Sequence, residues 1–280
     1  MALTTIIAPQ ELNERLGARD LVVFDCRHSL ADFALGRRIY DESHVPGAFF
    51  ADVESDLAGT KTGTNGRHPL PQPEAFASFL RSCGVSDATQ VVAYDAGADM
   101  FAPRFWFLTR WIGHDAVAVL DGGLTAWNAA GYPVSAEPSR AAGEGNLTLR
   151  LRPEFLVDAA YVREHLDDPA MQLLDARARE RFSGETEPID PVAGHIPGAL
   201  NRWFKENFAP DGKIKPRDEL RAEFGRAELD PKRVVHQCGS GVSAAAGLFA
   251  MHHAGLEGSR LYNGSWSEWV SDPSRPVAKG

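Results

Sequence analysis

The sequence predicts two consecutive α/β domains, each with a mainly parallel β-sheet flanked by helices. Short apolar runs, such as residues 21–25, 91–95 and 234–238, alternate along the chain with stretches of helical character. This alternation is typical of buried parallel strands joined by helical crossovers. Two further observations support the prediction: the main sequence landmarks occur twice, and a polar stretch containing Pro and Gly lies near the middle of the chain.

The landmarks of the first half return in the second half in the same order. The matched pairs are LVVFDCR (21–27) with QLLDAR (172–177), SHVPGA (43–48) with GHIPGA (194–199), VVAYD (91–95) with VVHQC (234–238), DGGLTAW (121–127) with NGSWSEW (263–269), and GYPV (131–134) with SRPV (274–277). This shared order indicates a duplicated unit. The first copy is about eight residues longer, in residues 58–73 (AGTKTGTNGRHPLPQP), which we predict to form a loop.

The polar stretch divides the two copies. We place an N-terminal domain at residues 1–136, a linker at 137–149 and a C-terminal domain at 150–280. Within the domains, PEAFASFLRSCG is predicted to be a helix closed by Gly84, and VSAAAGLFAMHHAG a helix that ends at Gly255.

Composition excludes several classes of protein. The chain has 280 residues, a formal net charge of −9 and a pI of about 5.5, so we expect no nucleic-acid partner. It has no apolar run of the roughly 18 residues that a membrane helix needs, and we expect neither a signal peptide nor membrane binding. Three cysteines, Cys26, Cys83 and Cys238, favour a reducing compartment, most simply the cytoplasm. We interpret Cys26 and Cys83 as structural.

Cys238 is the strongest candidate for a nucleophile. It ends an apolar run and is followed by GSGVS and a helical stretch, so it belongs at the carboxyl end of a strand, where open α/β sheets bind ligands. Gly239 and Gly241 let successive backbone N–H groups turn towards the sulfur, and these groups favour its anionic form. The alternative is a buried structural cysteine. Asp95 occupies the matching position in the first copy, which favours one active and one supporting domain.

Two other functions remain to be weighed. A phosphatase of the His-Cys-x5-Arg type also uses a thiolate in a loop of amides, but the residue six positions after Cys238 is Ala244, so the arginine that clamps phosphate is missing. A non-enzymatic sulfur carrier or regulatory binding module is the other alternative. Such a module is expected to lose the cysteine or the loop glycines, and the second copy keeps both.

The duplicated landmarks and the CGSGVSA loop resemble the two-domain rhodanese-type sulfurtransferases, and are most similar to the 3-mercaptopyruvate sulfurtransferases. The resemblance implies two tandem rhodanese-like domains and sulfur transfer through a persulfide on Cys238. The donor would be 3-mercaptopyruvate, with release of pyruvate, and the acceptor a thiol such as thioredoxin, a low-molecular-weight thiol or cyanide. Thiosulfate is the alternative donor, although the basic loop residue typical of thiosulfate-preferring members is absent. We expect no cofactor and no metal site.

The resemblance also assigns roles to individual residues. It implies that Arg181, which precedes Phe182, binds the donor. From their own positions we interpret Arg177, which follows Asp at a strand end, as structural, and Arg179 as part of a solvated face. The remaining positions implied in donor binding are Gly239, Gly241, Val242 and Ser243. The sequence departs from the family at ETEPIDPVAGH (185–195), which lacks the second arginine that many mercaptopyruvate enzymes carry.

Ser240 and His44 are the further catalytic candidates. Ser240 lies two residues after Cys238 and is implied to handle the donor or its proton; a loop hydroxyl bonded only to backbone is the alternative. His44 is implied to relay a proton with Ser240. The repetition of this histidine as His195 also fits a structural role in both copies.

Overall fold

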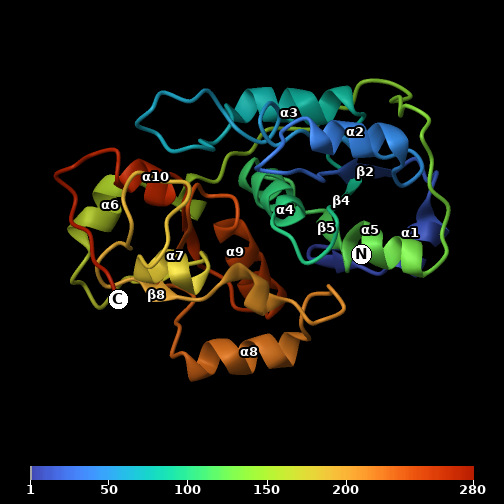
Figure 1. Cartoon of the computed structure of the whole chain (residues 1–280). Coiled ribbons are helices and arrows are strands. Elements are labelled where there is room, and N and C mark those ends of the chain that lie inside the picture. Colours follow the sequence, from blue (N-terminus) through green and yellow to red (C-terminus); the bar gives the residue numbers. More distant parts are fainter. Residues whose placement is uncertain (1) are drawn as a thin grey trace. The chain divides into compact units, whose positions relative to one another are not determined.

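The computed structural model describes residues 2–280 and contains two five-stranded, parallel sheets (Figure 1). The first has the strand order β1-β5-β4-β2-β3 and the second the order β6-β10-β9-β7-β8. The two orders are the same once the second set of strands is renumbered from its first member. The predicted architecture, two α/β domains with mainly parallel sheets flanked by helices, is therefore confirmed.

The first half supplies ten regular elements. They are β1 (Ile6–Ile7), α1 (Pro9–Arg15), β2 (Leu21–Asp25), α2 (Leu35–Glu42), β3 (Phe49–Phe50), α3 (Pro73–Ser82), β4 (Gln90–Tyr94), α4 (Phe101–Trp111), β5 (Val117–Leu120) and α5 (Gly123–Ala129). Leu12 of α1 and Trp127 of α5 pack on one face of the sheet, in a cluster with Val92 of β4. Phe105 of α4 packs against Phe24 of β2 on the other face. Both faces are covered, which is why the central strands β2, β4 and β5 are apolar except at Asp25 and Gln90.

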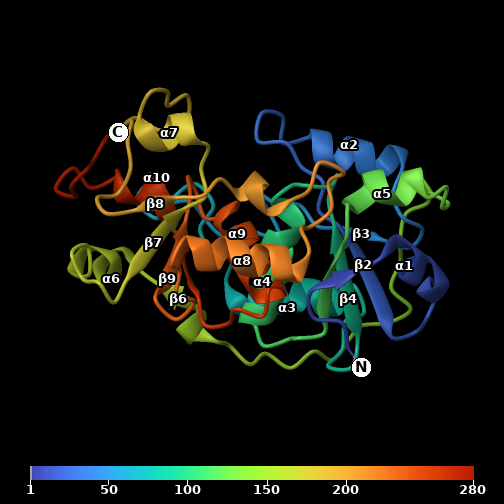
Figure 2. The same cartoon turned by 90° about the horizontal axis from the view of Figure 1, so that it is seen from below.

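The second half repeats this plan. Its elements are a 3₁₀ turn (Pro153–Phe155), β6 (Leu156–Val157), α6 (Ala159–Glu164), β7 (Gln172–Asp175), α7 (Arg179–Ser183), β8 (Leu200–Asn201), a 3₁₀ turn (Phe204–Asn207), α8 (Arg217–Arg226), β9 (Val234–Gln237), α9 (Ala244–His253), β10 (Arg260–Tyr262) and α10 (Ser265–Trp269). Helices α6 and α10 contribute Val162 and Trp266 to a core cluster with Val235 of β9. Helix α9 packs on β9 and β10, and α8 lies next to α9 (Figure 2).

The backbone contacts divide the chain into two compact units that are not continuous in sequence. Unit 1 comprises Met1–Gly59, Pro71–Arg152 and Phe208–Ile214, and unit 2 comprises Thr60–Leu70, Pro153–Asn207 and Lys215–Gly280. Each half of the chain thus gives a short segment to the other unit. The sequence-based division at 137–149 treated each domain as one stretch, because hydrophobic patterning contains no signal for such an exchange.

The repeated landmarks make the same kinds of contact in the two units. Tyr40 stacks on His44 with ring centroids 4.0 Å apart, and Phe182 stacks on His195 at 3.9 Å. His44 bridges Ser135 and His195 bridges Ala278 in the same antiparallel way. The indole N–H groups of both landmark tryptophans donate to a proline carbonyl, Trp127 to Pro133 and Trp269 to Pro276, each at 2.8 Å. Several of the repeated landmarks therefore make the contacts that hold the segments of each unit together.

Among residues 2–280, none of the helices has both the length and the apolar character that crossing a bilayer requires.

His236 is a buried titratable group in the centre of unit 2. It lies on β9 with 1% of its surface exposed, and its Nε2 has no hydrogen-bond partner within residues 2–280. A Cβ added to Gly247 of α9 would lie 2.8 Å from His236 Nδ1, so the helix packs directly on the ring. Burial lowers the pKa of His236 from 6.5 to about 3. Protonation of this ring is therefore coupled to unfolding.

We expect His236 to make unit 2 sensitive to acid. The imidazole takes up a proton near pH 6.5 in the unfolded chain and only near pH 3 in the folded chain. The stability that depends on a neutral His236 is therefore complete above pH 6.5 and is lost progressively below it. Between pH 6.5 and 5 the free energy of unfolding should fall by about 2 kcal/mol on this account. Urea unfolding followed by tryptophan fluorescence should show a flatter pH dependence for His236→Leu. An identical pH dependence in both proteins would contradict the assignment.

Candidate functional site

The cysteine loop, residues 238–243, connects β9 to α9 and surrounds one sulfur atom with backbone donors. Cys238 is 1% exposed, and its Sγ accepts N–H groups from Gly241 at 3.0 Å and from Ser240 at 3.4 Å. Gly241 has a φ of +85°, and a Cβ at this position would lie 2.3 Å from the carbonyl oxygen of Asn263. Only glycine satisfies both conditions, so the tight turn that aims the amides depends on it.

The start of α10 forms hydrogen bonds with the backbone of the cysteine loop. The N–H of Cys238 donates to Ser265 Oγ at 3.1 Å, and the N–H groups of Trp266 and Ser267 donate to the carbonyls of Cys238 and Gly239, each at 3.0 Å. Ser265 is fully buried and has a φ of +55°, an unusual conformation for a residue with a side chain. The NGSWSEW landmark is thus the platform on which the cysteine loop rests.

Ser240 is hydrogen-bonded to a histidine from the first half of the chain. His68 Nδ1 lies 2.8 Å from Ser240 Oγ, and both residues are buried. The carbonyl of His68 accepts the side-chain N–H of Asn263 at 3.1 Å. His68 belongs to the Thr60–Leu70 segment, so it is part of unit 2 together with the loop. The hydroxyl of Ser240 therefore has an imidazole partner that could exchange a proton with it.

Two arginines flank Gly239. A Cβ built on Gly239 would lie 3.0 Å from Arg67 Nη2 and 3.4 Å from both terminal nitrogens of Arg181. Asp190 accepts from both, through Oδ1 from Arg67 Nη1 and through Oδ2 from Arg181 Nη2 at 3.1 Å. Glu187 accepts from Arg181 Nε and Nη2, the shorter bond being 2.8 Å. The loop therefore has cationic groups beside it although it contains none itself.

The acids that hold these arginines are buried. Burial acts to raise the pKa of Glu187, but hydrogen bonds from Arg181 and from the backbone outweigh it and hold the pKa below its usual value. Burial raises the pKa of Asp190, against the opposing effect of Arg67 and Arg181. Arg177 is tied to Asp175 by a bidentate pair with a shortest distance of 2.7 Å, and also donates to Gly194 O at 2.8 Å. This agrees with a structural role for Arg177.

Unit 1 carries a carboxylate where unit 2 carries the sulfur. Asp95 accepts the N–H of Gly97 through Oδ1 and the N–H of Ala102 through Oδ2, each at 2.9 Å. Burial, followed by the nearby charge of Asp99, raises the pKa of Asp95 to about 7. In unit 1 the backbone N–H groups of the corresponding turn therefore bind a carboxylate in place of a cysteine sulfur.

The other predicted residues fall into two groups. Val242 and Ser243 are buried in the loop immediately before α9, close to Cys238. His44 lies in unit 1 with its Nδ1 2.7 Å from Tyr40 O and its Nε2 3.1 Å from Glu137 O. Its ring is thus occupied by backbone carbonyls of its own unit, and its part in proton transfer stays a prediction.

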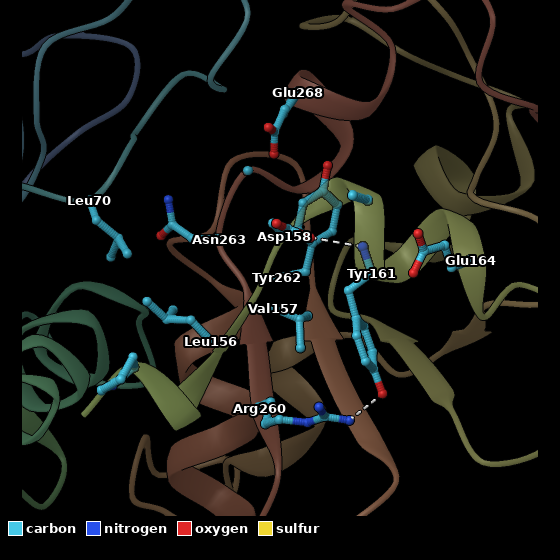
Figure 3. Close-up of a pocket in the computed structure, with 13 residues that line it drawn as sticks. Leu70, Leu156, Val157, Asp158, Tyr161, Glu164, Arg260, Tyr262, Asn263 and Glu268 are labelled. Atoms are coloured by element: carbon cyan, nitrogen blue, oxygen red, sulfur yellow. Dashed lines mark hydrogen bonds between the residues drawn. The ribbon is translucent and has the colours of Figure 1, made fainter.

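A pocket of about 730 Å³ lies beside the loop in unit 2, at the ends of β6 and β10 (Figure 3). Leu156, Val157 and Tyr161 form part of its apolar wall, and Glu268 lies near Tyr262 at its upper end in the view. Cys238 is not among the residues that line it. Asn263 is the link, because it lines the pocket and also contacts His68 and Gly241.

The sequence analysis missed Arg67 and His68. Both lie in the additional loop of the first copy, in the stretch NGRHPLP, and the structure joins this segment to unit 2. The available signal was the length difference itself, since an insertion carrying an arginine and a histidine has no counterpart in the second copy. Patterning alone gave no indication of which unit the insertion joins.

Comparisons with known proteins agree with this geometry. The model of the rhodanese-like domain matches residues 8–130 and 158–272. A probable 3-mercaptopyruvate sulfurtransferase of Pseudomonas aeruginosa is 47% identical, over all of both chains. Thiosulfate/3-mercaptopyruvate sulfurtransferase 2 of Arabidopsis thaliana is 31% identical, over 97% of this chain and 86% of the relative.

A solved structure shows the same likeness. The crystal structure of a 3-mercaptopyruvate sulfotransferase from Escherichia coli has a TM-score of 0.82 and 30% identity, over 94% of this chain and 99% of that one. Both family matches, the full-length identity and the shared architecture lead to one conclusion. The chain belongs to the rhodanese-like family and is an enzyme of its two-domain sulfurtransferase class.

Proposed function

We propose that the protein transfers sulfur from 3-mercaptopyruvate to a thiol or to cyanide through a persulfide on Cys238. The observation that carries this proposal is the pair of backbone N–H groups, from Ser240 and Gly241, that point at Sγ. Such donors stabilise an anionic sulfur, both in the attacking thiolate and in the terminal sulfur of a persulfide. The names of the Pseudomonas and Escherichia relatives support mercaptopyruvate as the donor.

The first half-reaction breaks a carbon–sulfur bond. The Cys238 thiolate attacks the donor sulfur, a sulfur–sulfur bond forms, and the electron pair of the carbon–sulfur bond stays on carbon as the enolate of pyruvate. One proton then reaches that carbon, and pyruvate leaves. In the second half-reaction an acceptor thiol, of thioredoxin or of a small molecule, or cyanide takes the outer sulfur and restores the thiolate.

We assign the proton transfer to Ser240 and His68. Their 2.8 Å contact joins the Thr60–Leu70 segment to the cysteine loop, where the donor's thiol proton must leave and the enolate carbon must gain one. His44, which the family resemblance suggested, is given a structural role because its nitrogens lie against the Tyr40 and Glu137 carbonyls.

Arg181 and the loop amides are the proposed donor-binding groups. Arg181 lies next to Gly239, and an arginine matches the geometry of a carboxylate. The loop positions that complete the set are Gly239, Gly241, Val242 and Ser243. We propose that the N-terminal domain, with Asp95 in place of the cysteine, does not react, and that the enzyme works in the reducing cytoplasm without cofactor, metal, nucleic acid or membrane.

Thiosulfate is the second candidate donor. The loop has no basic residue, but Arg67 and Arg181 place positive charge beside it, and the name of the Arabidopsis relative includes both donors. Attack on thiosulfate releases sulfite and requires no proton on the leaving group. The two donors therefore differ in their need for Ser240 and His68.

Sulfur loading tests the persulfide. Incubation with mercaptopyruvate should add one sulfur atom to the intact protein, as measured by mass spectrometry under non-reducing conditions. Cys238→Ser should abolish this gain, because burial raises the pKa of the other two thiols, Cys26 and Cys83, and so disfavours their thiolates. Cys83→Ser is the matched control and should load normally. No gain in the wild-type protein with either mercaptopyruvate or thiosulfate would contradict the proposal.

The two donors also test the proton transfer. His68→Asn and Ser240→Ala should lower kcat for mercaptopyruvate by about 100-fold, the usual scale for loss of a general acid–base group. Sulfur loading from thiosulfate should change much less, because sulfite leaves without a proton. Steady-state rates with each donor measure the ratio. The same donor-selective loss in His44→Gln, but not in His68→Asn, would return the relay to His44.

A further inference from the structure

We propose that Arg67 is a second donor-binding arginine, held beside the cysteine loop by Asp190 and acting with Arg181 on the same anionic group. The identity of that group as the carboxylate of an α-keto acid rests on the proposed function, but the presence of an anion site at the sulfur does not. The inference stands on the contacts of Arg67, on the exposure of the paired groups and on the local charge.

The contacts place Arg67 at the loop. Its Nη2 would lie 3.0 Å from a Cβ on Gly239, which is nearer than either terminal nitrogen of Arg181. Asp190 accepts from Arg67 through Nη1, which leaves Nη2 as the atom directed at Gly239. The backbone N–H of Arg67 donates to Ser267 Oγ at 3.1 Å, so the residue is also fixed at its main chain.

The cations are accessible and the acids are not. The side chains of Arg67 and Arg181 are 31% and 19% exposed, whereas those of Asp190 and Glu187 are each 3% exposed. In the ion pairs of Arg181 the bonding atoms are Nε and Nη2, and Nη1 takes no part in them. The buried carboxylates thus hold both guanidinium groups from behind, and the groups remain open to an incoming anion.

The charge count shows what Arg67 contributes. Arg67, Arg177 and Arg181 carry three positive charges. Their buried partners, Asp175, Glu187 and Asp190, carry three negative ones, so the cluster is neutral. Without Arg67 these groups would have a net charge of −1 next to the cysteine loop, which would repel an anionic donor.

This arrangement also accounts for the missing arginine of the second copy. Residues 185–195 contain Glu187 and Asp190 but no arginine. The Thr60–Leu70 segment brings Arg67 to Asp190 from the other half of the chain. A carboxylate bound by two guanidinium groups would be oriented as well as attracted, which sets the donor sulfur against Cys238.

Alkylation of Cys238 provides a test that does not depend on sulfur transfer. In both probes the thiolate forms a carbon–sulfur bond and iodide leaves, but iodoacetate carries a carboxylate and iodoacetamide does not. The ratio of the two rates therefore reports the attraction of an anion to the sulfur. Arg67→Ala should lower this ratio by about 3- to 10-fold, the scale of one partly exposed charge–charge hydrogen bond. Arg181→Ala should do the same.

Matched variants separate this role from a structural one. Arg179→Ala removes the same charge from the exposed start of α7 and should leave the ratio unchanged. Arg67→Lys should restore part of the ratio that Arg67→Ala loses, because it keeps the positive charge. The iodoacetamide rate should stay near the wild-type value in Arg67→Ala if the loop is intact, and the KM for mercaptopyruvate should rise with little change in kcat.

The outcomes are distinguishable. Equal ratios in Arg67→Ala and Arg179→Ala would overturn the proposal, as would a fall in the iodoacetamide rate equal to that in the iodoacetate rate. If the wild-type protein loads no sulfur from any donor, the proposed function fails, and the alkylation ratio still decides whether Arg67 attracts an anion to Cys238.

Discussion

The buried ion pair between Asp175 and Arg177 is the interaction on which the rest of the site depends. Arg177 is fixed at the end of β7, and from there it contacts Gly194 O and Glu187, and its guanidinium lies 4.8 Å from the centre of the Trp266 ring. Glu187 in turn orients Arg181. A buried pair of this kind contributes little net stability but fixes geometry, and the loss of one partner would leave a charge without compensation. The position of Arg181 beside the cysteine loop thus depends on an ion pair that follows β7, the strand next to β9.

The same pair occurs in unit 1, where Asp25 and Arg27 are joined at 2.6 Å. It follows the end of β2 there too, but the turn after β4 carries a carboxylate and no cysteine. Asp95 fills the turn that Cys238 fills in unit 2 and uses two backbone N–H groups for its own carboxylate. The comparison separates what the scaffold requires from what the chemistry requires. Both units contain the pair and the turn, and in unit 2 the turn holds a cysteine sulfur in place of the carboxylate.

The fold and the position of Cys238 in a glycine-containing loop could be predicted from the sequence, but some of the side chains beside that loop could not. Apolar runs and repeated landmarks predicted both sheets, because burial on two faces leaves a strong pattern in the residues themselves. Cys238 stood out since glycine spacing reports a required backbone conformation. Arg67 and His68 could not be found in this way, because each reaches the cysteine loop through contacts between residues far apart in sequence. His68 lies against Ser240, about 170 positions away, and Arg67 pairs with Asp190. No local sequence pattern encodes such contacts. The role of His44 was suggested by the family resemblance, whereas its repetition as His195 already pointed to a structural alternative in the sequence itself.

The Thr60–Leu70 segment has a consequence for how this protein can be divided. A fragment that begins after the linker would retain the sulfur, its amides and Arg181, and would look complete by every local criterion. It would nevertheless lack the imidazole partner of Ser240 and the second guanidinium, since both are encoded in the other half of the gene. The two halves are therefore structurally interdependent, because each compact unit includes a short segment from the other half of the chain.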